Sequence, residues 1–245
     1  MIVDFHTHVD DVPALGWHLP VDAVLAQLDE AGIHRAVVMT IVDAPAIRRD
    51  ALDVLAAACS ANERLYGFAR VHPWYDDAPA MLEHALDELG FRGLKLHGVS
   101  TLAHPGEEPV LRLVRIAADR GVPVMFHSGD DPFTTPLELA DAARAVPDAA
   151  IVLAHTGGYG HTEDAIAVAE RLPNVYLDTS AMPYPGALAA AVRRVGAERV
   201  LFASDAPGCP ATLELAKIRL AGLTDEELKL VLGGNAMRLL EKAAT

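Results

Sequence analysis

The sequence predicts a (β/α)8 barrel, the TIM-barrel form of an α/β fold, built as a single domain over residues 1–245. Short apolar runs alternate with longer stretches of helical periodicity, and successive runs begin roughly 24 to 32 residues apart. Repeated strand–helix units in a chain of 245 residues match the size of this barrel. The chain also lacks a Ser/Gly/Pro-rich linker or a low-complexity tract that would divide it into two domains.

Eight strands are expected, and each is a short run rich in Val, Ile, Leu and Phe. Their expected ranges are 2–8, 35–41, 65–72, 91–97, 122–128, 149–155, 174–180 and 199–205. An open doubly wound sheet is the competing fold. It should carry a GxGxxG turn after its first strand, whereas residues 10–18 read DDVPALGWH, so the barrel is favoured.

Amphipathic Ala- and Leu-rich segments between the strands predict helices, and several end at the glycine typical of a helix C-terminus. The clearest ranges are 21–32, 78–90, 109–121 and 162–172. One further helix is expected after the eighth unit, over residues 224–244. We expect it to break at Gly233 and Gly234, with Asn235 capping a new start.

Composition excludes several classes of function. Asp and Glu number 34 against 20 Lys and Arg, a net charge of −14, so nucleic acid is not an expected partner. No apolar run approaches the roughly 18 residues of a membrane span, and no secretory leader is evident. The two cysteines, Cys59 and Cys209, form no disulfide framework. We therefore expect a cytoplasmic protein that acts on a small molecule.

Polar residues gather at the carboxyl ends of the expected strands. Both faces of a barrel strand are normally apolar, and active sites lie at the carboxyl ends, so polar groups there indicate a site. Taken in strand order, these residues are His6, His8, Arg70, His72, Lys95, His97, His127, His155, Asp178, Ser180 and Asp205.

The pair in DFHTHVD suggests what this site binds. Residues i and i+2 of a strand share a face, so His6 and His8 point the same way. A hydrogen-bonded pair is the simpler interpretation when these two are considered alone. Two strand-1 imidazoles, with His127 from strand 5 and Asp205 from strand 8, provide the ligands that Zn²⁺ and related ions prefer. Such an ion lowers the pKa of its water from 15.7 to about 7.

These residues resemble those of the amidohydrolase superfamily. The strand-1 HxH, the single histidines ending strands 5 and 6, and the Asp in FASDAP carry the resemblance. The GLKLHG strand and the LGGNAMRLL tail are similar to its amidohydrolase-2 branch, which contains hydrolases, lactonases and non-oxidative decarboxylases. The resemblance implies one divalent ion held by His6, His8, His127 and Asp205, with Zn²⁺ expected first and Mn²⁺ second. It also implies catalytic roles for His155 beside the ion and for Asp205 as general base.

Other polar and aromatic residues are candidates for binding substrate. Lys95 is expected to remain a free amine that contacts a substrate carboxylate, the alternatives being carboxylation between two metals or an ion pair with Asp178. Arg70 suits a carboxylate or a structural ion pair equally well. His72, His97, Trp74 and Tyr159 complete the set, the last two as loop aromatics beside the barrel mouth.

The main functional prediction is a metal-dependent hydrolase of an amide, ester or lactone in a small carboxylate-bearing molecule. The alternative is a metal-dependent non-oxidative decarboxylase of an aromatic or diene carboxylate, since both reactions need a metal, an acid–base group and a cationic carboxylate site. A barrel kept only as a binding module predicts damaged ligand positions, and all of them are intact. A homodimer is expected from the resemblance alone.

Overall fold

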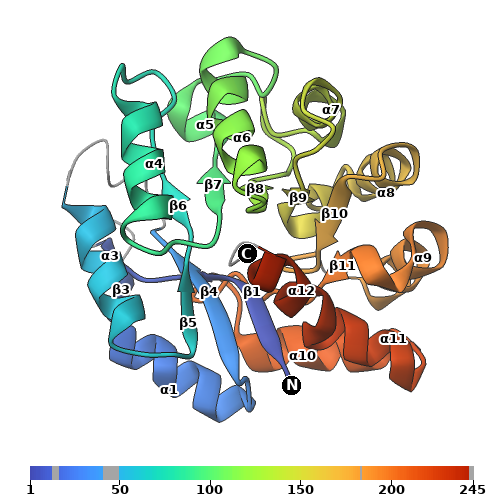
Figure 1. The fold of residues 1–245 in the computed structure, drawn as a ribbon. Coiled ribbons are helices and arrows are strands. Elements are labelled where there is room, and N and C mark those ends of the chain that lie inside the picture. Colours follow the sequence, from blue (N-terminus) through green and yellow to red (C-terminus); the bar gives the residue numbers. More distant parts are fainter. Residues whose placement is uncertain (13–16, 41–49, 183, 243–245) are drawn as a thin grey trace.

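Parallel strands form the centre of the computed structural model, which describes residues 1–12, 17–40, 50–182 and 184–242 (Figure 1). One sheet has the strand order β1-β4-β5, and another has the order β11-β10-β9-β8-β7-β6. The bounds are β1 (Val3–His8), β4 (Arg35–Met39), β5 (Leu65–Gly67), β6 (Ala69–Arg70), β7 (Leu94–Leu96), β8 (Val124–Phe126), β9 (Ile151–Leu153), β10 (Val175–Asp178) and β11 (Val200–Leu201).

Backbone hydrogen bonds join the two sheets into one closed ring. β5 and β6 form one continuous strand interrupted at Phe68, whose N–H donates to the Val38 carbonyl at 3.0 Å. On the opposite side the first and last strands meet. Phe5 N–H donates to the Phe202 carbonyl at 3.0 Å, and Asp205 N–H donates to the His6 carbonyl at 2.8 Å. The predicted (β/α)8 barrel is therefore confirmed.

The strands are shorter than the sequence predicted. The eighth was expected over 199–205, but its ladder covers only Val200–Leu201. Beyond Leu201, the Ala203 N–H donates to the side-chain Oγ1 of Thr179 at 3.2 Å instead of to a backbone carbonyl, so the ladder with β10 ends there. The last residue of the second expected strand, Ile41, lies outside the described residues. A short antiparallel hairpin, β2 (Asp10–Val12) and β3 (Trp17–Leu19), follows β1 and was not predicted.

Helices surround the ring, and most of them follow the strands in alternation (Figure 1). They are α1 (Val21–Ala31), α3 (Ala51–Ser60), α4 (Ala78–Asp87), α5 (Gly98–Thr101), α6 (Glu108–Asp119), α7 (Pro136–Ala145), α8 (Thr162–Arg171), α9 (Pro185–Val195), α10 (Ala211–Leu220), α11 (Asp225–Lys229) and α12 (Asn235–Lys242).

The hydrophobic core has two layers. An outer layer lies between the strands and the helices, and includes Leu28, Leu82 and Leu139. An inner layer fills the ring with Phe5 and Phe68, whose rings meet edge to face at 5.5 Å. Leu239 and Leu240 of α12 belong to the inner layer, and α12 lies across the ring in Figure 1. Because α12 covers the amino ends of the strands, the opposite, carboxyl end remains for a site.

The C-terminal helix does not break at its glycines, contrary to the sequence prediction. Residues Leu230–Gly234 form a turn of π-helix that connects α11 to α12. Asn235 has helical backbone angles, and its amide donates to the carbonyls of Ala197 and Val200, so it ties this helix to the ring instead of capping it. A Cβ on Gly233 would lie 2.6 Å from the Met1 carbonyl oxygen, so glycine permits this close contact. The last two residues of the predicted range, 243 and 244, are outside the described residues.

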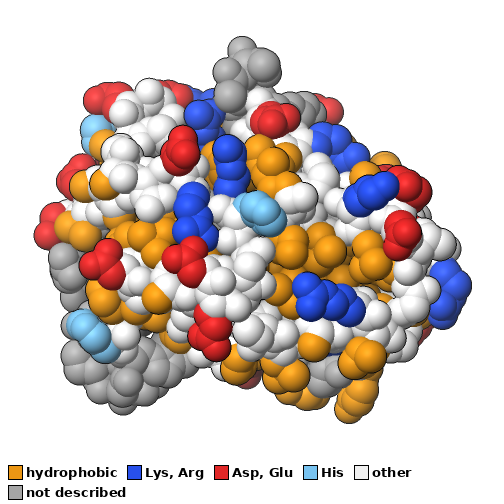
Figure 2. Space-filling view, turned by 90° about the horizontal axis from the view of Figure 1, so that it is seen from below, with side chains coloured by type: hydrophobic (Ala, Val, Ile, Leu, Met, Phe, Trp, Pro, Cys, Tyr) orange, Lys and Arg blue, Asp and Glu red, His pale blue; other side chains and the backbone are white. Residues whose placement is uncertain are grey.

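Hydrophobic side chains gather on the face shown in Figure 2. The helix α10 lies along the lower edge of Figure 1 and so faces the viewer there. Leu213 and Leu220 of α10 are 62% and 75% exposed. An exposed apolar patch is typical of an association surface, and the expected homodimer stays a prediction. Among the described residues, no helix combines the length and the apolar character that crossing a membrane requires.

Candidate active site

The first strand contains a β-bulge that aims its histidines into the ring. Asp4 pairs with Ala36 and Thr7 pairs with Val38, so β1 has one more residue than β4 between these pairs. The extra residue reverses the alternation of side chains. As a result, Phe5 lies in the inner core, while His6 and His8 also point inward and line a cavity.

Asp4 holds this bulge against the segment that follows β11. Its Oδ1 accepts hydrogen bonds from the N–H groups of His6 at 3.2 Å and Ser204 at 2.9 Å. Asp4 therefore fixes the backbone immediately beside both His6 and Asp205. The side chain is fully buried, and this burial raises the pKa of Asp4 to about 7.

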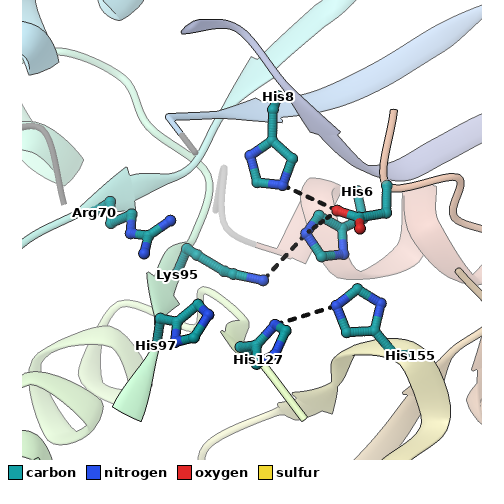
Figure 3. A pocket seen from close by; sticks show the side chains of 8 residues that line it. His6, His8, Arg70, Lys95, His97, His127 and His155 are labelled. Atoms are coloured by element: carbon teal, nitrogen blue, oxygen red, sulfur yellow. Dashed lines mark hydrogen bonds and ion pairs between the residues drawn. The ribbon is translucent and has the colours of Figure 1, made fainter. Parts of the chain in front are cut away.

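A cavity of about 120 Å³ opens at the carboxyl ends of the strands (Figure 3). Its walls come from six strand ends and consist entirely of polar side chains. They are His6, His8, Arg70, Lys95, His97, His127, His155 and Asp205. Among the positions predicted from the sequence, these eight are the ones that the fold brings together here.

Three potential metal-binding atoms converge on one wall of this cavity. Asp205 Oδ1 lies 3.0 Å from His8 Nε2 and 3.3 Å from His6 Nε2. His8 Nδ1 faces another acceptor, the Thr40 carbonyl oxygen, at 3.2 Å. A neutral imidazole has one hydrogen, and if Nδ1 donates it to the Thr40 carbonyl, Nε2 presents a lone pair toward Asp205 Oδ1. Nitrogen and carboxylate oxygen atoms at this spacing fit a divalent cation.

Asp205 itself has a left-handed backbone, with φ of 61°. This conformation is uncommon for residues other than glycine, although Asp adopts it more readily than most, and such residues cluster at active sites. Burial alone would raise the pKa of the Asp205 carboxyl group, but the imidazoles of His6, His8 and His155 hold this pKa well below its usual value. Asp205 is thus ionised at neutral pH, which suits both a metal ligand and a general base.

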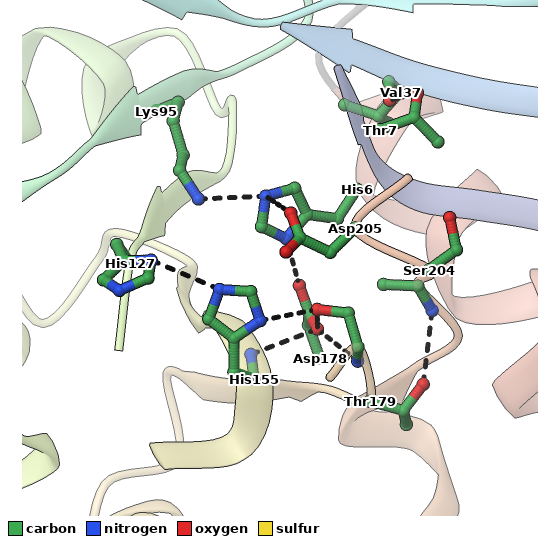
Figure 4. A network of polar contacts seen from close by, with 12 residues as sticks. His6, Thr7, Val37, Lys95, His127, His155, Asp178, Thr179, Ser204 and Asp205 are labelled. Carbon is green, nitrogen blue, oxygen red and sulfur yellow. Dashed lines mark hydrogen bonds and ion pairs between the residues drawn. The ribbon is translucent and has the colours of Figure 1, made fainter. Parts of the chain in front are cut away.

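A second carboxylate, Asp178, lies behind the cavity wall and contacts two of its histidines (Figure 4). Asp178 Oδ2 lies 2.9 Å from His6 Nδ1. Asp178 Oδ1 accepts the backbone N–H of His155 at 3.2 Å and the hydroxyl of Ser180 at 2.5 Å. Burial acts to raise the pKa of Asp178, yet these hydrogen bonds and the nearby imidazoles lower it below its usual value.

His127 and His155 follow the neighbouring strands β8 and β9 and form a pair. His127 Nδ1 lies 3.2 Å from His155 Nε2, and the His127 ring stacks on His97 with centroids 4.0 Å apart. His127 lines the cavity but lies outside the close cluster of His6, His8 and Asp205. Its role as the fourth ligand stays a prediction. Burial lowers the pKa of both His127 and His155, so both rings are neutral.

Two buried cations face the cavity beside these acceptors. Lys95 is 1% exposed, and its Nζ lies 3.1 Å from His6 Nε2. Burial and the Lys95 charge lower the pKa of His6 to about 3, so His6 is neutral. Arg70 is 2% exposed and donates to the Thr40 carbonyl and to Ser100 Oγ, both at 3.2 Å. These contacts hold the guanidinium at the cavity edge.

Three predicted substrate-binding residues do not line this cavity. His72 packs its ring against Tyr75 at 5.1 Å, and within the described chain its Nδ1 has no hydrogen-bond partner. Trp74 is 48% exposed on the surface. Tyr159 is 69% exposed and lines a separate cavity beside α10. Their contact with substrate stays a prediction.

The sequence indicated Asp178 and Ser180 only as polar residues at the end of strand 7. Their spacing of two residues was the available signal, because i and i+2 share a face. The partner considered for Asp178 was Lys95, whereas the structure pairs Asp178 with His6 across 172 residues of chain. Asp4 was not singled out, because its role depends on a bulge that no sequence pattern marks.

Comparison with known proteins identifies the family of this chain. A family model described as amidohydrolase matches residues 3–242, which confirms the resemblance seen in the sequence. No curated protein matches the chain.

Several solved structures share the fold. An uncharacterized TIM-barrel protein from Bordetella bronchiseptica is 21% identical, with a TM-score of 0.83, and 100% of this chain and 99% of that one are covered. A 5-carboxyvanillate decarboxylase from Novosphingobium aromaticivorans, complexed with manganese and 4-hydroxy-3-methoxy-5-nitrobenzoic acid, is 15% identical with a TM-score of 0.83, over 98% and 96% of the chains. A 2,6-dihydroxybenzoate decarboxylase from Rhizobium is 19% identical, with a TM-score of 0.77 over 98% of both chains.

Proposed function

This chain belongs to the amidohydrolase family, and we propose that it is a metal-dependent lyase that releases CO₂ from a small aromatic or diene carboxylate. Hydrolysis of an amide, ester or lactone is the second candidate. This order reverses the one that the sequence favoured. Two of the solved structures that share the fold are decarboxylases of aromatic acids, and this likeness supports the change.

One observation carries the proposal: two buried cations and a cluster of metal-binding atoms share a single small cavity. A carboxylate accepts hydrogen bonds from a Lys ammonium and from an Arg guanidinium, so two such cations at one cavity suit an anionic substrate. Figure 3 shows Arg70, Lys95 and His97 on one side of the cavity and His6 and His155 on the other. A substrate that places its carboxylate near Arg70 and Lys95 therefore has its remaining atoms beside His155 and Asp205.

The donor set fits a divalent cation held by His6, His8 and Asp205, with His127 as the proposed further ligand. Such a cation would supply positive charge that binds and orients an anionic substrate. We propose Mn²⁺ as the first ion to test, because the Novosphingobium decarboxylase is complexed with manganese. Zn²⁺, which the sequence favoured, is the alternative, since imidazole and carboxylate ligands suit both ions.

The residues of the chain then have defined parts in the reaction. Loss of CO₂ breaks a C–C bond and leaves its electron pair on carbon, so that carbon must gain one proton. The Lys95 ammonium carries protons at the cavity wall, 3.1 Å from His6 Nε2. Neutral His155 is a proton acceptor that can first remove a proton from a substrate hydroxyl and later return it. Arg70 keeps the carboxylate in place, because its own contacts fix the guanidinium.

Hydrolysis remains the second candidate because of Asp205. An ionised carboxylate beside the proposed cation is suited to accept a proton from an attacking water. Both reactions use the same cavity, so product analysis must separate them.

The test follows CO₂ and protons together. Metal-free protein is loaded with Mn²⁺ and given a panel of hydroxybenzoates, and a second panel of lactones and esters, in a weakly buffered solution. Decarboxylation consumes one proton for each CO₂ released, whereas ester or lactone hydrolysis releases a proton and no CO₂. CO₂ release that is abolished by a chelator and by Asp205→Asn supports the lyase. Proton release without CO₂ would establish the hydrolase instead.

A further inference from the structure

Asp178 Oδ1 accepts hydrogen bonds from three donors. The backbone N–H groups of His155 and Ser180 reach it at 3.2 and 2.7 Å, and a backbone N–H can only donate. Two such donors leave no room for a hydrogen on Oδ1 itself. The third contact, with Ser180 Oγ at 2.5 Å, therefore uses the hydrogen of the serine hydroxyl.

This arrangement determines which nitrogen of His155 carries hydrogen. Ser180 has a single hydroxyl hydrogen and gives it to Asp178, so its oxygen must accept in its other contact, with His155 Nδ1 at 2.9 Å. His155 Nδ1 is thus the protonated nitrogen. Because a neutral imidazole has one N–H, His155 Nε2 carries a lone pair, and His127 Nδ1 at 3.2 Å is the donor to it.

The other oxygen of Asp178, Oδ2, contacts the His6 ring, and the contacts of this ring likewise show which of its nitrogens carries the hydrogen. The Lys95 ammonium can only donate, so the His6 Nε2 that lies 3.1 Å away accepts. The single hydrogen of His6 is then on Nδ1, where it is donated to Asp178 Oδ2 at 2.9 Å. His6 Nε2, the nitrogen that faces Asp205, therefore carries a lone pair that could bind a cation in place of the Lys95 contact.

We propose that Asp178 and Ser180 are positioning residues that set the tautomers of His6 and His155, so that both rings present an unprotonated Nε2 to the cavity. The Asp178 carboxylate acts on both rings. Its Oδ2 contacts His6, the proposed metal ligand, and its Oδ1 acts through Ser180 on His155, the proposed catalytic histidine. A carboxylate behind a ligating histidine orients the ring and increases its basicity. The inference deepens the proposed function and rests on it, because that function gives the two tautomers their purpose. The hydrogen positions themselves do not depend on bound metal or substrate.

Backbone contacts explain how the chain keeps this geometry. His155 and Thr156 have left-handed backbones, with φ of 59° and 46°. Thr156 Oγ1 donates to the Asp178 carbonyl at 2.6 Å, and His155 N–H donates to the Asp178 side chain. The turn after β9 is therefore attached to the end of β10 at two points, and this attachment brings the His155 ring to Ser180.

The experiment reads the hydrogen positions by ¹⁵N NMR of metal-free protein labelled at histidine, at pH 7.5. Signals are assigned with His6→Gln and His155→Gln. Long-range ¹H–¹⁵N couplings distinguish a protonated ring nitrogen from an unprotonated one. The native protein is expected to show the Nδ1–H form for both His6 and His155. An Nε2–H form at either ring would overturn the proposal, whatever the protein catalyses.

Two variants separate the two oxygens of Asp178. In Asp178→Asn, the amide oxygen keeps the Ser180 contact and the amide NH₂ faces His6 Nδ1. His6 is then expected to lose its exclusive Nδ1–H form, because its hydrogen can move to Nε2 and be donated to Asp205 Oδ1, while His155 stays unchanged. In Ser180→Ala, His155 is expected to lose its exclusive Nδ1–H form while His6 keeps its own. The matched control is Ser128→Ala, because Ser128 is also buried and within the described residues its Oγ makes no hydrogen bond.

Metal affinity provides a second readout that needs no substrate. Mn²⁺ binding, measured by calorimetry, is expected to weaken about 10- to 100-fold in Asp178→Asn, as for other residues behind metal ligands. Ser180→Ala and Ser128→Ala are expected to bind Mn²⁺ within about threefold of the native protein. Equal affinity in Asp178→Asn, or an unchanged His155 signal in folded Ser180→Ala, would overturn the proposal. If the tautomers are as stated and no turnover is seen, only the proposed function fails.

Discussion

Replacing Asp4 by Asn should change how stability depends on pH. The carboxyl group is fully buried, accepts the N–H groups of His6 and Ser204 through Oδ1, and within the described chain has no partner for Oδ2. Burial raises its pKa from 3.8 in the unfolded chain to about 7 in the fold. Asparagine keeps the accepting oxygen and cannot ionise.

The direction of this pH dependence follows from the number of protons that the folded and unfolded states bind. Between pH 4 and 7 the folded protein keeps the Asp4 proton and the unfolded chain has lost it, so the contribution of Asp4 to stability falls as the pH rises. The slope is about 1.4 kcal/mol per pH unit, and the total is up to about 4 kcal/mol across this range. The free energy of unfolding of the native protein minus that of Asp4→Asn should therefore decrease by this amount from pH 4 to 7.

Urea unfolding of both proteins, metal-free and at half-unit intervals of pH, measures this difference. Titration of every other group contributes equally to the two proteins and cancels, provided that the variant changes only Asp4. A difference that stays constant within about 1 kcal/mol from pH 4 to 7 would refute the reasoning, since Asp4 would then have an ordinary pKa in the fold.

Three further predictions concern the metal, the substrate and the C-terminal helix. His8→Ala should reduce bound Mn²⁺ from about one equivalent to nearly none by elemental analysis, and full retention would remove His8 from the ligand set. Arg70→Lys should raise KM for a carboxylate substrate about 10- to 100-fold with a smaller effect on kcat, because lysine lacks the planar fork that reaches both Thr40 and Ser100. An unchanged KM would make Arg70 purely structural. Gly233→Ala should destabilise the fold by about 1–3 kcal/mol in urea, because its Cβ would lie 2.6 Å from the Met1 carbonyl oxygen. The control Gly186→Ala, which lies in α9 and has open space around its Cβ, should not destabilise the fold.

Periodicity predicted the order of the barrel elements, because buried strands and amphipathic helices differ in the spacing of apolar residues. It also placed His6, His8 and Asp205 at strand ends on the same side of the barrel. The structure brings all three within one cluster, although they are separated by up to 199 positions in the chain. This outcome follows from topology, since parallel strands in a closed barrel all end on one side.

Other features depend on contacts that no local pattern contains. The β1 bulge arises from pairing with β4 and from the Asp4 contact with Ser204, 200 residues away. The π-helical turn before Asn235 reflects the packing of Gly233 on the first residue of the chain. The contact of Asp178 with His6 was not predicted for the same reason, because Lys95 and His6 are equally plausible partners until the ring is closed. Local signals identified the residues of this site but not their pairings.

The closure of the ring between its first and last strands gives a bound cation a mechanical effect. His8 and Asp205 are 197 residues apart, and a cation that both residues ligate would cross-link nearly the whole chain into one loop. The amide hydrogens of His8 and Asp205, which bond across this junction to Ala206 and His6, should then exchange with solvent more slowly. Binding of the ion would thus stabilise the junction between the first and last strands of the barrel.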